Sequence, residues 1–281
     1  MKSLTISKKW VARIIAILLA MSFTLVGCSG SNNASQSGDS TSANTTKLTV
    51  GFDDSYPPYG FLDDNGGYTG FDLDLAKKVC ELNGWDIELK AIDWDSKDAL
   101  LDSGQINCIW NGFTMEGRED KYNFSDPYML NEQVIVVKKD SGISINSDLA
   151  GKVVVTQAGS AALDVLEGDE KDLADTFGRL DTIADYNNAF MQLESGNVDA
   201  VACDLSIAAY QMSANPDTYV QLTTPLSSEN YAVGFKKDDT GKDMAAKVTK
   251  SLKTLTDNGT VKELCEKYAE YGLDYSNWEI K

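Results

Sequence analysis

The polar residues of this chain that are best placed to bind a ligand each follow a predicted strand. Within one or two residues, short apolar segments of the kind that form buried strands are followed by Asp53, Asn111, Gln157 and Asp204. Open α/β sheets bind their ligands in the crevice beyond the carboxyl ends of the strands. The four positions therefore predict a polar binding site at such an edge.

The composition excludes several kinds of chemistry. The 281 residues include no histidine, which removes Ser-His-Asp and Cys-His nucleophile systems and histidine-ligated zinc or haem. Asp and Glu number 43 against 25 Lys and Arg, giving a formal net charge of −18, which argues against binding to nucleic acid. The cysteines show no C-x-x-C spacing. We expect neither a metal nor a cofactor.

The first 28 residues have the pattern of a lipoprotein signal. A basic start without acids precedes an apolar stretch over 14–26, which is short for a membrane span and typical of a signal-peptide core. The stretch ends in Leu25-Val26-Gly27-Cys28, which resembles the bacterial lipobox. We expect a signal peptide over 1–27 and a lipid on Cys28 that anchors the protein to the membrane. The alternative is an N-terminal anchor helix with an incidental cysteine.

The segment 28–46 is expected to be a lipidated flexible tether. It is dominated by Ser, Asn, Gly and Thr and has too little apolar surface to offset the entropy of ordering. A lipid, a tether and a folded body from Lys47 onward describe a protein on the extracytoplasmic face of a membrane, at the cell surface or in a periplasm.

From Lys47 the pattern alternates strands and helices twice. The first series implies a parallel sheet with helices on both faces. It has strands over 47–51, 86–92 and 106–110 and helices over 70–83 and 96–103. The second series has strands over 134–137, 153–155, 198–203 and 231–235 and helices over 160–166, 186–193, about 204–212 and 242–271, the last broken at 258–259.

Two α/β units in one chain predict two doubly wound lobes. The C-terminal helices are left over after the second unit closes, so the second unit is inserted in the first. The predicted fold class is therefore α/β with two lobes.

Several motifs, in order, resemble the polar amino-acid solute-binding proteins of ABC importers. They cover essentially all of 47–271. They are Tyr56-Pro57-Pro58-Tyr59, Gly70-Phe71-Asp72-Leu73-Asp74-Leu75-Ala76, Ser103-Gly104, Trp110-Asn111-Gly112-Phe113-Thr114, Arg118, Phe124-Ser125-Asp126-Pro127-Tyr128, Asp148-Leu149-Ala150-Gly151-Lys152, Gln157-Ala158-Gly159-Ser160, Gly196-Asn197-Val198-Asp199-Ala200 with Asp204, and Asp257-Asn258-Gly259-Thr260.

This resemblance implies a periplasmic-binding-protein fold of type II with the ligand in a cleft between the lobes. Lobe 1 would comprise 47–127 plus 232–281, lobe 2 would comprise 133–226, and the hinges would lie at 128–132 and 227–231. It also implies a monomeric binding protein, not an enzyme. Such a protein captures a polar amino acid, closes by hinge motion and docks on a permease driven by an ATPase.

The ligand carboxylate is expected to bind Arg118, because a guanidinium offers planar, bidentate donors. Thr114 and Arg118 are four residues apart, one fewer than in the family pattern. Backbone N–H groups at the helix start around Ser160 and Ala161 would add donors. The alternatives are an exposed pair of Arg118 with Glu119 or Asp120, and helix capping by Ser160.

The ligand ammonium is expected to bind Asp204, with the carbonyl of Gly112 and the hydroxyl of Thr114 completing its shell. Asp204 could instead cap the helix that follows it. Neither this aspartate nor the arginine of the site is expected to titrate near neutral pH.

The ligand side chain is expected to meet Asp53, Tyr56, Trp94 and Gln157, with Asn111 at the same edge. Aromatic faces beside an acid favour a cationic or amide side chain. In the alternative readings, the aromatic rings belong to the core or rim and the aspartate forms a turn.

Other classes of function stay open. One rival is an extracytoplasmic dehydratase on the same scaffold, since acids are plentiful, and a surface adhesin or sensor component is another. The four cysteines after the tether are expected to be free, buried and apolar in character. The one pair to check for a disulfide is Cys80 with Cys265.

Overall fold

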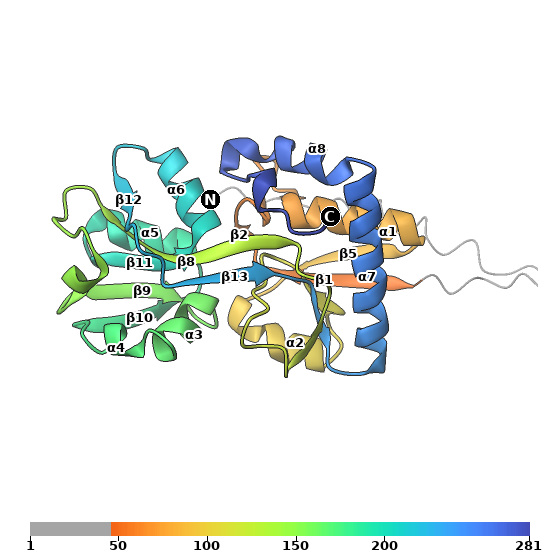
Figure 1. The fold of residues 1–281 in the computed structure, drawn as a ribbon, viewed down its shortest axis with the longest axis horizontal. Helices are drawn as coiled ribbons and strands as arrows, with labels where there is room; N and C mark the ends of the chain where they lie inside the picture. The colour runs from red at the N-terminus through yellow and green to blue at the C-terminus, as the bar shows by residue number, and fades with distance from the viewer. Residues whose placement is uncertain (1–45) are drawn as a thin grey trace, which may run out of the picture. The chain divides into compact units, whose positions relative to one another are not determined.

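A computed structural model describes residues 46–281 (Figure 1). The predicted signal peptide, the lipidation site Cys28 and all but the last residue of the predicted tether lie outside these residues. Within 46–281, no helix is long and apolar enough to cross a membrane.

The first lobe is built on a five-stranded sheet in the order β5-β1-β6-β14-β7. The parallel order expected from the sequence holds for the three strands β5, β1 and β6. β14 is antiparallel to both of its neighbours, because the chain enters it from the second lobe without a crossover helix. The strands are β1 (Lys47–Phe52), β5 (Asp86–Ala91), β6 (Cys108–Ile109), β7 (Tyr122–Phe124) and β14 (Gly234–Lys236).

The helices of the first lobe include the expected C-terminal pair. They are α1 (Phe71–Asn83), α2 (Lys97–Asp102), α7 (Asp239–Asp257) and α8 (Thr260–Lys267), with 3-10 turns η2 (Trp94–Ser96), η4 (Ala269–Tyr271) and η5 (Tyr275–Asn277). α1 packs against α7 and α8. Gly84 ends α1 with φ 64 and donates to the carbonyls of Cys80 and Glu81, which explains why the helix stops at the glycine.

The second lobe is built on a sheet in the order β10-β9-β11-β8-β12, with β13 also paired to β8. β10, β9 and β11 are parallel, and β8 is antiparallel to its three partners. The strands are β8 (Met129–Lys138), β9 (Val153–Gln157), β10 (Arg179–Ile183), β11 (Ala200–Asp204), β12 (Tyr219–Gln221) and β13 (Ser227–Tyr231).

Helices cover both faces of this second sheet, as the sequence predicts. Along β11, Ala200 and Ala202 belong to one buried cluster, and Val201 and Cys203 belong to another. This alternation is the period of a strand buried on both sides. The helices are α3 (Ala161–Glu167), α4 (Lys171–Ala174), α5 (Tyr186–Ser195) and α6 (Leu205–Ala214), with the 3-10 turn η3 (Asn146–Leu149).

The two segments expected as crossovers are hydrogen-bonded strands. Met129 pairs with Tyr231 and Gln133 with Ser227, so 129–133 and 227–231 run antiparallel in one ladder. The single strand expected over 231–235 is wrong. The chain leaves β13 at Tyr231 and enters β14 at Gly234, because it changes partners from the second sheet to the first.

A small third sheet lies where only a loop was expected. β2 (Ser55–Tyr56), β3 (Gly60–Leu62) and β4 (Tyr68–Thr69) pair antiparallel. Gly70 follows them with φ 139, and a Cβ there would stand 2.1 Å from the carbonyl oxygen of Tyr59. Only glycine fits this contact between the small sheet and the start of α1.

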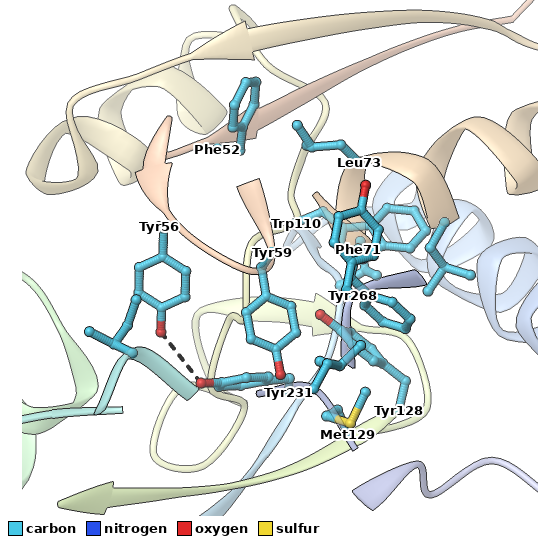
Figure 2. Packing of buried hydrophobic residues seen from close by; sticks show 14 of the residues in the cluster. Phe52, Tyr56, Tyr59, Phe71, Leu73, Trp110, Tyr128, Met129, Tyr231 and Tyr268 are labelled. Atoms are coloured by element: carbon cyan, nitrogen blue, oxygen red, sulfur yellow. Dashed lines mark hydrogen bonds between the residues drawn. The ribbon is translucent and has the colours of Figure 1, made fainter. Parts of the chain in front are cut away.

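Buried aromatic rings connect this small sheet to the strand β13 (Figure 2). The rings of Tyr59 and Tyr231 meet edge to face with centroids 5.2 Å apart, and Tyr59 meets Phe71 at 6.1 Å. The four cysteines within 46–281 are free and buried, as expected, and Cys80 and Cys265 form no disulfide.

Substituting Gly70 tests the close approach of its backbone to Tyr59. Gly70→Ala is expected to lower the free energy of unfolding by at least about 2 kcal/mol, because strained backbone and a clash add together. Gly66→Ala is the matched control, since Gly66 also has positive φ but nothing lies within 4 Å of a Cβ there. It should cost only about 1 kcal/mol. Equal losses in urea unfolding would contradict the argument.

Candidate functional site

Nine of the residues predicted for the site line one pocket between the two sheets. They are Tyr56, Trp94, Gly112, Thr114, Arg118, Gln157, Ser160, Ala161 and Asp204. The pocket volume is about 10 Å³, roughly the space for one water molecule. A wider pocket of about 640 Å³ adjoins it and shares Thr114, Arg118 and Ala161. The lobes must therefore part to admit a larger molecule.

The polar residues at strand ends lie where the sequence predicts them. Asp53 directly follows β1, Asn111 follows β6, and Gln157 and Asp204 are the last residues of β9 and β11. Asp53 and Asn111 do not line the pocket themselves. They support it from behind, because the Asp53 N–H donates to Asn111 Oδ1 at 2.6 Å and Gln157 Nε2 donates to Asp53 Oδ2 at 2.6 Å.

Arg118 is 8% exposed and directs its guanidinium across the cleft. Nη2 lies 2.7 Å from Asp164 Oδ2 on α3, and Nη1 donates to the carbonyl of Thr114 at 3.3 Å. The guanidinium carbon stands 5.0 Å from the centre of the Phe113 ring. The alternative of a pair with Glu119 or Asp120 is not observed, and the shorter spacing still brings the side chain into the pocket.

Ser160 has both of the roles that the sequence allowed, as a pocket wall and as a helix cap. Its Oγ accepts from the N–H of Leu163 at 3.2 Å and lies 3.1 Å from Thr156 Oγ1. The first N–H groups of α3, beginning at Ala161, therefore start at the pocket wall. Such groups favour an anion.

Asp204 occupies the N-cap position of α6, but its side chain makes no capping bond. Oδ1 instead accepts from Asn131 Nδ2 at 2.9 Å, Gln133 Nε2 at 2.6 Å and Tyr231 Oη at 3.0 Å. The helix-capping alternative is thus wrong for this carboxylate. The strands β8 and β13 fix it at the pocket.

Glu229 on β13 is a buried acid of the site that sequence reasoning missed. Its Oε1 accepts from Thr114 Oγ1 at 2.7 Å, from Asn131 Nδ2 at 2.8 Å and from Gln133 Nε2 at 2.7 Å. The hydroxyl expected to face a ligand ammonium is therefore bonded to this acid. The signal was an acid inside the expected hinge 227–231, two residues before a tyrosine.

Burial makes the two neighbouring acids of the site, Asp204 and Glu229, harder to ionise than exposed carboxyls. Burial raises the pKa of Glu229 to about 7, and the charge of Asp204 adds to the rise. Burial also raises the pKa of Asp204. Each carboxyl loses hydration and faces a like charge, so the charged forms are disfavoured.

Asp53, a third acid of the site, forms a turn and also bonds a residue of the pocket wall. Oδ1 accepts from the N–H of Ser55 at 2.8 Å, while Oδ2 holds the amide of Gln157. Burial raises the pKa of Asp53 to about 6, against the opposing effect of these two bonds. The turn and the bond to the pocket wall use different oxygens of one carboxylate.

The two predicted aromatic walls are also core residues. Trp94 is 7% exposed and meets Phe113 edge to face at 5.8 Å. Tyr56 directs its hydroxyl to Tyr231, with the oxygens 3.4 Å apart (Figure 2). Its ring lies 6.1 Å from that of Tyr186 in the second lobe. Core packing thus holds both rings at the pocket.

Two further residues, Asp72 and Lys97, support the site without lining the small pocket. Asp72 is fully buried and accepts from the N–H of Gly112 and from Tyr128 Oη, both at 2.7 Å. Lys97 Nζ donates across the cleft to the carbonyl of Gly159 at 2.9 Å. Asp72 belongs to the motif Gly70–Ala76, but its role was not predicted, because the residues that bond it are distant in sequence.

This fold and pocket agree with the comparisons with known proteins. Residues 48–271 match the family of bacterial extracellular solute-binding proteins, family 3, and the chain belongs to that family. The arginine-binding extracellular protein ArtP of Bacillus subtilis is 29% identical over 93% of this chain and 98% of its own length.

Two solved structures of relatives have the same fold. A substrate-binding protein of an ABC uptake transporter from Streptococcus pneumoniae, with bound histidine, has a TM-score of 0.77 and 34% identity over 82% of this chain and 94% of that one. The ancestral amino-acid-binding protein AncCDT-1, a precursor of cyclohexadienyl dehydratase, has a TM-score of 0.71 and 32% identity over 79% and 95%. The two-lobed, type II periplasmic-binding-protein fold expected from the motifs is thereby confirmed.

Removing the Asp72 carboxylate is expected to loosen the loop that carries Gly112. Asp72→Ala should lower the free energy of unfolding by about 2–4 kcal/mol, because it leaves a buried N–H and a buried hydroxyl without an acceptor. Asp86→Ala, at the exposed start of β5, is the control and should change stability by less than about 0.5 kcal/mol. Chemical denaturation measures both, and a loss below about 1 kcal/mol for Asp72→Ala would contradict this role.

Proposed function

We propose that this protein captures a polar L-amino acid with a cationic or amide side chain and delivers it to an ABC importer. The observation that carries the proposal is the pocket itself. It has a guanidinium on one wall and a carboxylate on another, which suits a zwitterion. The relatives named for arginine and histidine support the same class of ligand.

Arg118 is proposed to bind the ligand carboxylate together with the first N–H groups of α3. Its present partner, Asp164, has a side chain that is 61% exposed, so this ion pair is weak enough for a ligand to replace. Asp204 is proposed to bind the ammonium. The hydrogen bonds from β8 and β13 hold its carboxylate in place before a ligand arrives.

The ligand side chain is proposed to lie between Tyr56 and Trp94 and to reach Gln157. Flat or cationic groups stack well on such rings. Asp53, bonded behind Gln157, gives this end of the pocket a negative charge whenever it is ionised. Side chains of arginine, lysine, histidine or glutamine fit these requirements.

Closure is proposed to follow a hinge motion at 128–132 and 227–231. Three contacts join the lobes around the pocket, from Asp53 to Gln157, from Lys97 to Gly159 and from Arg118 to Asp164. A ligand that touches both lobes would favour the closed form by its differential affinity.

A dehydratase reaction on the same scaffold is the second candidate, since AncCDT-1 is described as a precursor of such an enzyme. That relative is itself described as an amino-acid-binding protein, which favours binding over turnover. Incubation with prephenate or arogenate tests the candidate, and product formation would revive it.

Attachment through Cys28 is proposed to hold the monomer at the extracytoplasmic face of the membrane, beside its permease and ATPase. Membrane fractionation of cells tests it. The unaltered protein should sediment with membranes, whereas Cys28→Ala should not be lipidated. Equal labelling of the two by a fatty-acid probe would refute the anchor.

Calorimetric titration with the twenty amino acids tests the binding site. Arg118→Ala and Asp204→Asn are each expected to weaken the tightest-binding amino acid by about 100-fold or more, because each leaves a ligand charge buried and unpaired. Arg179→Ala is the control, since Arg179 forms an exposed ion pair with Asp181 on β10. Unchanged affinity in both site variants would show that this assignment is wrong.

A further inference from the structure

We propose that Asp204 and Glu229 act as one acid pair that holds a single proton in the ligand-free protein. The charged amino group of the ligand would then displace that proton to solvent. This inference rests on the proposed amino-acid binding and adds Glu229 as a second determinant of specificity.

The two carboxylates share the same two amide donors. Asn131 Nδ2 lies 2.9 Å from Asp204 Oδ1 and 2.8 Å from Glu229 Oε1. Gln133 Nε2 lies 2.6 Å and 2.7 Å from the same two oxygens. The oxygens are therefore within about 5 Å of each other, and both residues are 4% exposed. Two full negative charges at this distance repel strongly away from water.

Among residues 46–281, the groups around the pair supply hydrogen bonds but no paired cation. Tyr231 Oη donates to Asp204, and Thr114 Oγ1 donates to Glu229. The other titratable groups that act on the pair or its tyrosine partner are Tyr56, Tyr59, Tyr186 and Cys203. Burial raises the pKa of each of these four far enough to keep it neutral.

Two of the acidic and basic side chains that line the adjoining pocket have other partners. Arg118 gives its bonds to Asp164 and to a backbone carbonyl. Glu116 accepts from the backbone and side-chain N–H groups of Asn230. Gln133 is fully buried, and its Oε1 has no hydrogen-bond partner in the part of the chain that the structure describes. Its Nε2 is thus directed at the two acids, and a proton or a ligand cation is needed to offset their combined charge.

A primary ammonium group can replace the proton. It carries one positive charge and three N–H donors, enough to bond both carboxylates and one more acceptor. One ammonium enters and one proton leaves to solvent, so the charge of the site is conserved. An N-acetylated amino acid has no such charge, and two adjacent acids reject it more strongly than one acid does.

The pH dependence follows from this exchange. In the pH range in which the pair holds a proton without ligand and loses it on binding, the association constant for the ligand rises about tenfold per pH unit. The raised pKa of Glu229, about 7, sets the range, so affinity should rise from pH 5 to 7 and level off above pH 8. Asp53 has a raised pKa of about 6 and bonds Gln157, so its contribution has to be separated.

Calorimetry with L-arginine, or with the tightest-binding amino acid of the panel, measures the proton directly. Titrations at pH 6 are carried out in cacodylate and in Bis-Tris, two buffers that take up protons with different heats. The difference between the measured heats gives the number of protons released. About one proton is expected from the pair at pH 6 and almost none at pH 8.5. Asp53→Asn should keep this release, and Glu116→Gln, the exposed control, should match the unaltered protein.

Glu229→Gln is expected to abolish the release from the pair and to flatten the pH profile. At pH 8.5, where Glu229 is ionised in the unaltered protein, the variant should bind the ligand about tenfold or more weakly than the unaltered protein. At pH 5.5 the two affinities should agree within about threefold. Release that persists in Glu229→Gln and disappears in Asp53→Asn would overturn the inference while amino-acid binding stands. If no amino acid binds the unaltered protein, the proposed function itself fails.

Carboxyl carbon NMR of the unaltered protein covers the case in which Glu229→Gln does not fold. The Glu229 carboxyl signal should titrate near pH 7 without ligand and below about pH 5 with L-arginine bound. A signal that titrates at the same pH in both states would equally overturn the inference.

Discussion

The pairing of β8 with β13 is the constraint on which the rest of the site depends. Its register sets Asn131 opposite Glu229 and Met129 opposite Tyr231, so the shared donors and one of the acids come from facing strands. The same two strands lead from one sheet to the other. Slipping the ladder by one residue would turn these side chains to the opposite face. One set of backbone hydrogen bonds therefore fixes both the binding geometry and the connection between the lobes.

The buried acids of the site lower the stability of the fold when they ionise. Buried carboxylates lose hydration, which raises the pKa of Asp53, Asp72, Asp204 and Glu229. A carboxyl whose pKa is raised in the folded state contributes most to the stability of the fold at pH values below its pKa in the unfolded chain. That contribution is lost as the pH rises through the folded pKa. Apolar residues of similar volume would form a more stable core. The polar pocket therefore does not serve folding, which supports the proposed recognition of a charged ligand.

Local patterns in the sequence predicted the main strands and the polar residues at their ends. They did not predict contacts between residues that are distant in sequence. Apolar runs predicted β1, β9 and β11, and the polar residue that follows each run lies at the carboxyl end of its strand, as predicted. Glu229 stands in a polar segment, Ser-Ser-Glu-Asn-Tyr, and its three hydrogen-bond donors lie between 96 and 115 residues earlier in the chain. Arg118 could be located from its motif, but its partner, 46 residues further on, could not. The short strands β2 to β4 escaped for a different reason, because they are only two or three residues long and lie in a segment rich in Gly, Pro and Asp, which predicts a loop.

The contacts between the lobes show how ligand binding and closure can reinforce each other. From the first lobe, Asp53, Lys97 and Arg118 all reach one segment of the second, residues 157–164. The bonds to Gln157 and Gly159 are largely buried, whereas Asp164 is 61% exposed and its ion pair is worth little. A ligand carboxylate at Arg118 would replace the weakest of the three and leave the other two intact. Closure around a ligand would then exchange one exposed ion pair for contacts to the ligand and keep the two more buried bonds between the lobes.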